Sequence, residues 1–179
     1  MNHPRRRATL TCLAAGLLTA ALPAGSAAAY PDKPIRLVVP FPPGQGADIL
    51  ARLIGQHLAA ALGQPIVVEN KVGAGGIIGT AFAAKAAPDG YTLYMGSSGP
   101  LAIGPHVYKA VGFDTLKDFA PISNIASVTQ VLVTAPASQL ASAKAVVERA
   151  RAQPGMVPFG SDGSGTTGPL TVELATQMC

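Results

Sequence analysis

The chain has 179 residues, with 13 Lys and Arg against 9 Asp and Glu, a formal net charge of +4 and 49% hydrophobic residues. All nine acidic residues lie downstream of Arg5, Arg6 and Arg7, and without these three arginines the net charge is +1. A nearly neutral chain with no basic run lacks the cations that a nucleic-acid backbone requires, so nucleic acid is not expected as a partner. The cysteines are Cys12, in an apolar stretch, and Cys179, and they predict no internal disulfide and no metal site.

The N-terminal stretch, residues 1–29, predicts a secretory signal peptide. Three arginines precede an uncharged run rich in alanine and leucine over residues 8–24, and Ala27-Ala28-Ala29 offers a cleavage site before Tyr30. A basic start, a short apolar core and small residues at the cut are typical of exported proteins. The apolar run is too short and too rich in alanine for a membrane span. We therefore expect a soluble periplasmic protein.

The next stretch, residues 35–48, predicts a buried strand, a stiff loop and the start of a helix. Residues 35–39 form a short, mostly β-branched apolar run, which suits a strand covered on both faces. The prolines that follow end the strand, and two glycines give the loop its conformational freedom. A helix is expected from near Asp48 to Leu62. Because N–H groups and the helix dipole favour an anion at a helix N-terminus, this loop is the first candidate binding site.

Two more units of the same kind follow. Strands are expected over residues 66–70 and 92–95, with a helix over residues 77–87 between them. Short strands alternating with helices predict a parallel sheet with right-handed crossovers. Ligands bind outside the carboxyl ends of such strands. The glycine-rich loops expected at that edge are residues 41–46, 71–76 and 97–99.

The remaining part of the chain is less regular. We expect it to cross into a second domain near Val128, and few apolar anchors follow that point. So short a segment buries little surface, which predicts a truncated second domain. The expected elements are a short helix or turn over residues 101–107, strands over 122–127 and 130–134, a helix capped by Ser142 that runs to Ala152, a strand over 157–160, and a helix over 170–178.

Two glycine-rich runs are similar to nucleotide-binding motifs, but neither matches its motif. The run over residues 73–79 breaks the G-x-G-x-x-G spacing at Ile78, and no acidic residue lies at the required distance beyond it. The run over residues 160–167 has Thr166 where a phosphate loop needs lysine. No G-x-S-x-G occurs, and His57 lies within a predicted helix as a surface or packing residue. We expect no enzyme and no cofactor, and keep a nucleotide-using α/β enzyme as the lesser alternative.

Five groups of motifs along the chain, taken together, are similar to those of one family. They are Pro34 to Gly44 with Asp48 to Arg52, Leu62 to Pro65 with Val67 to Asn70, Gly73 to Gly76 with Ile78 to Thr80, Ala87 to Leu93, and Asp118 to Ile122. In these motifs the chain resembles the substrate-binding receptors of tripartite tricarboxylate transporters, also called Bug proteins. The resemblance covers nearly all residues after the predicted signal peptide.

The resemblance implies an α/β, periplasmic-binding-protein-like clamshell of two doubly wound domains. Residues 30–127 would form the first domain, and residues 128–179 part of the second. It implies capture of a small organic acid, such as a di- or tricarboxylate, for a transporter of one large and one small integral-membrane subunit. The implied ligand-binding residues are Phe41, Pro42, Gly44, Gln45, Gly46, Asp48, Ser97, Ser98, Gly99, Ser161, Gly163, Ser164, Gly165 and Thr166.

The sequence departs from the family pattern in three ways. Gln45 stands in place of the middle glycine of the usual Gly-Gly-Gly, which would narrow or polarise the pocket. Leu101 and Pro169 occupy places where many relatives carry histidine. Mature chains of the family are also about twice this long. A nonfunctional truncated fragment of such a receptor is therefore the alternative to a working receptor.

Overall fold

The structure, a computed structural model, describes residues 30–161 and 163–178. The described residues from Lys33 onward form one compact unit. Every helix and strand described below belongs to this unit. The predicted signal peptide over residues 1–29 lies outside the described residues.

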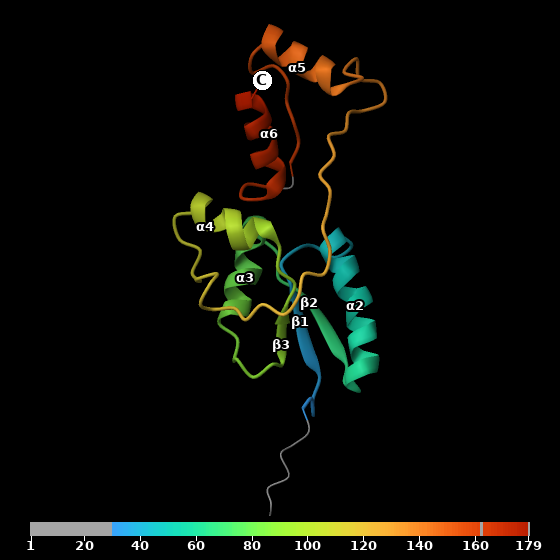
Figure 1. The fold of residues 1–179 in the computed structure, drawn as a ribbon, viewed down its shortest axis with the longest axis vertical. Coiled ribbons are helices and arrows are strands. Elements are labelled where there is room, and N and C mark those ends of the chain that lie inside the picture. Colours follow the sequence, from blue (N-terminus) through green and yellow to red (C-terminus); the bar gives the residue numbers. More distant parts are fainter. Residues whose placement is uncertain (1–29, 162, 179) are drawn as a thin grey trace, which may run out of the picture. The chain divides into compact units, whose positions relative to one another are not determined.

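Three parallel strands form one sheet (Figure 1). They are β1, Ile35–Val39, β2, Ile66–Asn70, and β3, Thr92–Tyr94, in the order β2-β1-β3. β1 pairs with β2 along its whole length, from Ile35 opposite Ile66 to Val39 opposite Asn70. All three strands therefore end at one edge of the sheet. The parallel sheet is confirmed, and so are the bounds predicted for β1 and β2.

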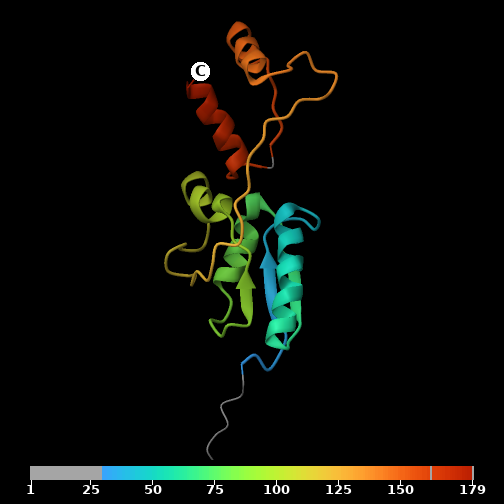
Figure 2. The same cartoon turned by 45° about the vertical axis from the view of Figure 1, so that its right-hand side comes forward.

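Alternate residues of β1 face opposite sides of the sheet, and a helix covers each side (Figure 2). Leu37 and Val39 pack with Ala51 in one buried apolar cluster. On the other side the guanidinium of Arg36 lies 5.8 Å from the ring centre of Phe82. The covering helices are α2, Gly46–Leu62, and α3, Ile77–Ala84. Because both faces are covered, β1 is apolar at every position except Arg36.

The two helices differ from their predicted bounds at one end each. α2 begins at Gly46, two residues before Asp48, and ends at Leu62 as predicted. α3 ends at Ala84 rather than at Ala87. Its end tightens because Lys85 and Ala86 donate their N–H groups to carbonyls only three residues earlier.

A short helical segment follows β3, as the sequence predicted. It consists of the π-helix η3, Gly99–Ile103, and the single turn α4, Gly104–Val107. A Cβ on Gly104 would lie 2.5 Å from Cδ1 of Ile77. The bare backbone of Gly104 therefore lets α4 lie directly against the start of α3.

The last two helices are α5, Ala143–Ala152, and α6, Thr167–Met178. The hydroxyl of Ser142 accepts a hydrogen bond from the N–H of Ala145 at 3.1 Å, so the predicted cap and bounds of α5 are confirmed. α6 begins three residues before the predicted position at Leu170. The domain boundary near Val128 stays a prediction.

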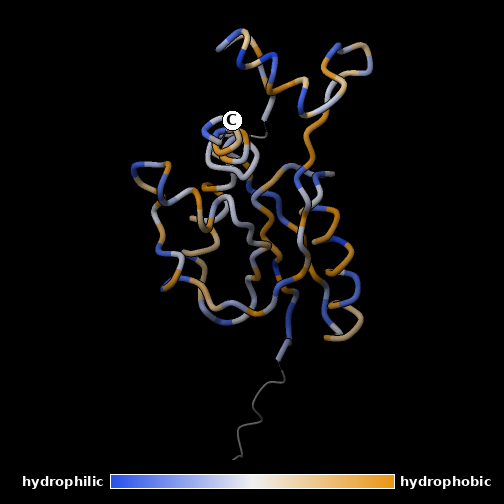
Figure 3. Tube along the Cα trace, turned by 45° about the horizontal axis from the view of Figure 1, so that its top comes forward, coloured by the Kyte–Doolittle hydropathy of each residue, from blue (hydrophilic) through white to orange (hydrophobic). Residues whose placement is uncertain are grey.

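The strands predicted over residues 122–127, 130–134 and 157–160 are wrong, because no described residue in these segments forms a strand. Their side chains lie open to solvent, with Ile122 83% exposed and Val133 78% exposed. A strand requires hydrogen-bonding partners and a covered face, and the described part of the chain gives these segments neither. Their apolar composition resembles that of a strand all the same, and Figure 3 marks much of the segment leading to α5 in orange.

Candidate functional site

A groove of about 480 Å³ lies at the carboxyl edge of the sheet, between the loop after β1 and the loop after β2. Among the described residues that line the groove, none carries a charge. Its walls combine apolar side chains with bare glycine backbone. The lining residues are Pro40, Phe41, Pro42, Gln45, Val72, Gly73, Gly75 and Gly76.

The loop after β1 is held from behind by Asp48, which is only 2% exposed. One carboxylate oxygen, Oδ2, accepts the N–H of Gly44 at 2.8 Å and Nε of Arg52 at 2.9 Å. The other, Oδ1, accepts Nδ2 of Asn70 at 2.9 Å. The hydrogen bond from Arg52, with those from Gly44 and Asn70, holds the pKa of Asp48 well below its usual range. This aspartate is therefore a buried carboxylate whose two oxygens both accept hydrogen bonds from the protein itself.

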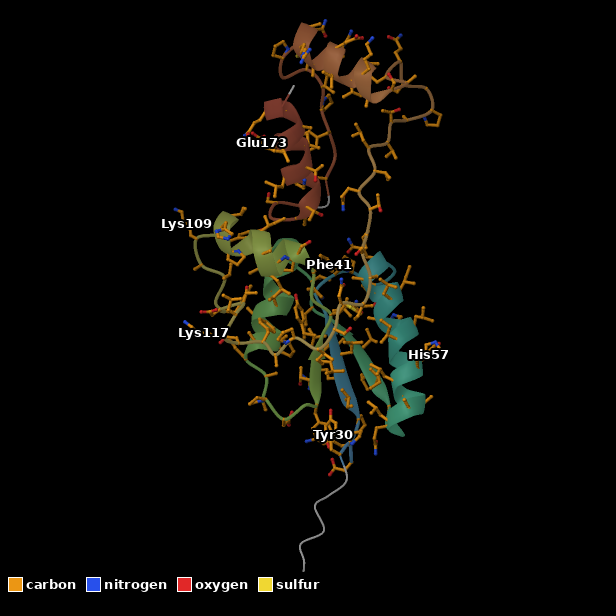
Figure 4. The ribbon with its side chains drawn as sticks, in the orientation of Figure 1. Tyr30, Phe41, His57, Lys109, Lys117 and Glu173 are labelled. Carbon is orange, nitrogen blue, oxygen red and sulfur yellow. The ribbon has the colours of Figure 1, made fainter. Side chains whose placement is uncertain are left out.

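Asn70, the last residue of β2, connects this carboxylate to the other end of the loop. Its Nδ2 also donates to the carbonyl of Phe41 at 2.9 Å, while its Oδ1 accepts from Nη2 of Arg52 at 3.2 Å. The first and fourth residues of the loop over 41–44 are thus tied to two side chains that bond each other. Figure 4 labels Phe41, which lines the groove.

Gln45 stands at the N-cap of α2 and lines the groove. Its backbone has φ −74° and ψ 156°, an extended conformation open to any residue, so a side chain is tolerated at this position. Gly44 before it has φ +83°, in the region that favours glycine. The Gln45 side chain makes no capping hydrogen bond, so its amide is not used on the helix end.

The opposite wall has an unusual backbone. Four consecutive residues have positive φ, at +131° for Gly73, +48° for Ala74, +61° for Gly75 and +98° for Gly76. Ala74 is the only residue of the four with a Cβ. A residue with a Cβ in the left-handed region of φ and ψ destabilises the fold by about 1 kcal/mol or more. The sequence placed this loop at the correct edge, but the predicted site residues did not include it.

A series of hydrogen bonds between buried polar groups fixes the end of this wall. The hydroxyl of Thr80, which is 0% exposed, donates to the carbonyl of Gly76 at 2.8 Å. The hydroxyl of Tyr94 is hydrogen-bonded to the same Thr80 oxygen. Because the single hydroxyl proton of Thr80 is committed to Gly76, Tyr94 must be the donor. Burial raises the pKa of Tyr94 to about 12, so this phenol keeps its proton.

The other predicted loops meet one another beside this wall. The carbonyl of Ser164 accepts the Tyr108 hydroxyl at 2.7 Å, and it would lie 2.6 Å from a Cβ on Gly75. A Cβ on Gly99 would lie 3.2 Å from the carbonyl of Gly165. The contact at Gly75 requires bare backbone, whereas a side chain at Gly99 would force its neighbour to shift by a few tenths of an ångström.

The predicted residues therefore fall into groups. Phe41, Pro42 and Gln45 line the groove, whereas Gly44, Gly46 and Asp48 belong to the same turn but are absent from its described lining. The residues of the last two loops range from buried to exposed. Gly99, Gly165 and Thr166 are buried, Ser97 and Gly163 are partly exposed, and Ser98, Ser161 and Ser164 are exposed.

Sequence reasoning missed two parts of the site. The loop from Gly73 to Gly76 could have been predicted as part of the site, because it is rich in glycine and was expected at the correct edge of the sheet. The role of Tyr108 could not be predicted from the sequence, because its contact with Ser164 joins residues 56 positions apart in the chain.

A second cavity, of about 390 Å³, lies at the amino-terminal edge of the sheet and is lined by Lys33, Arg36 and Tyr91 among others. Lys33 Nζ lies 4.2 Å from the ring centre of Tyr91 and 3.9 Å from Oδ2 of Asp89. None of the predicted site residues lines this cavity. Both cations already have partners, Asp89 for Lys33 and Glu69 for Arg36.

The described residues hold no group of three or more His, Cys, Asp and Glu arranged to bind a metal ion. No described helix has both the length and the apolar character that a bilayer crossing requires. His57 is exposed on α2, and Figure 4 shows its side chain on the outer side of that helix.

Comparison with known proteins identifies the family. A family model described as the tripartite tricarboxylate transporter family receptor matches residues 50–178. The chain belongs to this family. Protein BugT of Bordetella pertussis, strain Tohama I, is 44% identical over 150 residues, which is 83% of this chain and 46% of BugT. The resemblance noted in the motifs is thus confirmed.

Solved structures agree on the fold of this chain. One, described as a periplasmic transporter, matches with a TM-score of 0.78 at 41% identity, over 84% of this chain and 50% of that chain. Another, R. palustris Rpa4515 with adipate, matches with a TM-score of 0.79 at 36% identity, over 83% of this chain and 50% of that one. The expected α/β, periplasmic-binding-protein-like fold is confirmed for the part that aligns. The chain spans about half the length of the curated relatives it matches.

Proposed function

We propose that this receptor captures a small organic carboxylate in the periplasm and presents it to the integral-membrane subunits of a tripartite transporter. The observation that carries the proposal is the neutral groove at the carboxyl edge of the sheet, with Gln45 at the start of α2 in its wall. N–H groups at a helix N-terminus and the partial positive charge there favour an anion. The edge itself is the usual ligand position in parallel α/β sheets.

The chemistry of the groove narrows the ligand class. With no cationic side chain among its described lining residues, the groove would hold a carboxylate through backbone dipoles and the Gln45 amide. Each further charge on the ligand would have to be desolvated without a partner in this wall, which is costly. Phe41, Pro42 and Val72 offer apolar contact to a hydrocarbon body instead. A carboxylate with an apolar chain, such as the adipate bound by Rpa4515, therefore fits better than a tricarboxylate.

The absence of a catalytic role is part of the proposal. A nucleophile requires a base within hydrogen-bond reach, and the lining residues that the structure describes include neither a titratable group nor a serine or cysteine. The family and the fold are those of solute-binding receptors. A nucleotide-using enzyme has no observation in its favour.

Calorimetric titration of the protein with adipate, hexanoate and citrate tests the proposal. We expect adipate or hexanoate to bind at least about tenfold more tightly than citrate, a difference of about 1.4 kcal/mol. Gln45→Gly should reduce that preference by removing the one polar side chain among the described lining residues of the groove, while leaving the melting temperature nearly unchanged. A protein that melts cooperatively and gives no heat with any of the three acids would favour the alternative, a fragment without receptor function.

A further inference from the structure

Asp48 was predicted to contact the ligand, but its geometry suits another role. A carboxylate that contacts an anionic ligand would repel it unless protonated. The Asp48 carboxylate is 2% exposed, and its pKa lies well below the usual range because Arg52, Gly44 and Asn70 donate to it. It stays ionised at neutral pH and turns both oxygens toward the protein.

The three donors connect different parts of the fold. Gly44 belongs to the loop, Arg52 lies one turn further along α2, and Asn70 ends the neighbouring strand β2. Asn70 then reaches back to the carbonyl of Phe41 at 2.9 Å. Both ends of residues 41–44 are therefore fixed to the same carboxylate, one directly and one through an amide.

We propose that Asp48 is a positioning residue that holds the loop over residues 41–45 in its binding conformation without touching the ligand. The buried carboxylate orders the loop because it accepts the N–H of Gly44 directly and holds the Asn70 amide that donates to the carbonyl of Phe41. Arg52 compensates that charge, so the groove remains neutral for an incoming anion. The proposal that Asp48 orders the loop depends only on the hydrogen bonds. The proposal that it affects ligand affinity rests on the proposed function.

Amide hydrogen exchange tests the loop-ordering part without any ligand. In Asp48→Asn we expect the Gly44 amide to exchange about tenfold faster or more, as follows from losing one charge-assisted hydrogen bond. The amides of Val38 and Met95 in the sheet should keep their protection, which a general loss of stability would not allow. Unchanged exchange at Gly44 would overturn the proposal.

A matched control exists at the opposite edge of the sheet. Asp89 is exposed, and its Oδ1 accepts the N–H of Tyr91 at 3.0 Å. Asp89→Asn makes the same chemical change and should leave Gly44 exchange at its wild-type rate. If Asp48→Asn does not fold, Arg52→Gln replaces a half-exposed side chain and should still speed Gly44 exchange. Equal acceleration at Gly44 in Asp89→Asn would contradict a local role for Asp48.

Adipate titration of the same variants separates positioning from direct contact. Positioning predicts that Asp48→Asn weakens adipate binding about tenfold, because the loop loses its order. Direct contact predicts equal or tighter binding, because a negative charge is removed beside an anion, and that result would overturn the proposal. If the wild-type protein binds none of the acids tested, the proposed function fails while the exchange result still decides the role of Asp48.

Discussion

At the scale of single residues, Asp48 should make stability depend on pH. Its pKa is lower in the folded chain than in the unfolded one, chiefly because of Arg52. Such a group contributes stability that is fully present above about pH 4 and is lost as the pH falls toward the folded-state pKa. We expect the urea midpoint to be flat from pH 7 to 5 and to fall below about pH 4.

Comparison with Asp48→Asn isolates this contribution. Glu69 and Asp114 also have lowered pKa values, through Lys71 and Lys117 respectively, so both proteins should lose stability in acid. The wild type should lose more, and the two urea midpoints should converge as the pH falls. If the urea midpoints of the two proteins fall in parallel with pH, the ionised form of Asp48 does not stabilise the folded chain.

Gly79 offers a second test at this scale. A Cβ there would lie 2.5 Å from the carbonyl oxygen of Lys71 and 2.9 Å from Cα of Pro40, and both are backbone atoms that cannot move aside easily. Gly79→Ala should lower the free energy of unfolding by about 1–3 kcal/mol, as measured by urea denaturation.

Gly46 is the matched helical control. No atom lies within 4 Å of a Cβ placed there, and its φ is not positive. Gly46→Ala should raise the free energy of unfolding by about 0.5 kcal/mol, since alanine restricts the unfolded chain. An equal effect of the two substitutions would mean that α3 does not approach β1 and β2 as closely as the structure places it.

At the scale of elements, local signals determined which predictions were correct. β1, β2 and α5 have the predicted bounds because a β-branched run, a proline and glycine stop or a serine cap acts within a few residues. The strands expected over residues 122–127 and 130–134 had the same local composition. Pairing depends on distant segments, so composition alone could not tell a paired strand from an exposed chain.

The candidate site shows the same division. The sequence located the loop after β1 through its prolines and glycines, and that loop lines the groove. It could not assign Asp48 to the interior, because this depends on Asn70, 22 positions later in the chain. The other wall is likewise fixed by hydrogen bonds between distant elements, which join Tyr94 of β3 through Thr80 of α3 to Gly76. No sequence pattern predicts these hydrogen bonds.

At the scale of the whole chain, the segment over residues 120–134 is the most accessible long stretch among the described residues, since every residue in it is exposed. Ile122, Val128 and Val131 are each more than 70% exposed, although such residues usually lie in a core. Proteases cut exposed backbone that can enter their active sites, and paired strands resist them. Brief treatment with thermolysin, which cuts before apolar residues, should therefore cleave first within residues 120–134.

Mass spectrometry of the first fragments would locate the cut. We expect an early product that retains β1, β2 and β3 and persists, because the sheet and its two covering helices form a connected core. The urea-unfolded chain is the control and should be cut throughout. A persistent product ending near Val128 would support the predicted boundary between residues 30–127 and 128–179. First cuts inside α2 or β3 would instead mean that the sheet is less stable than the segment that leaves it.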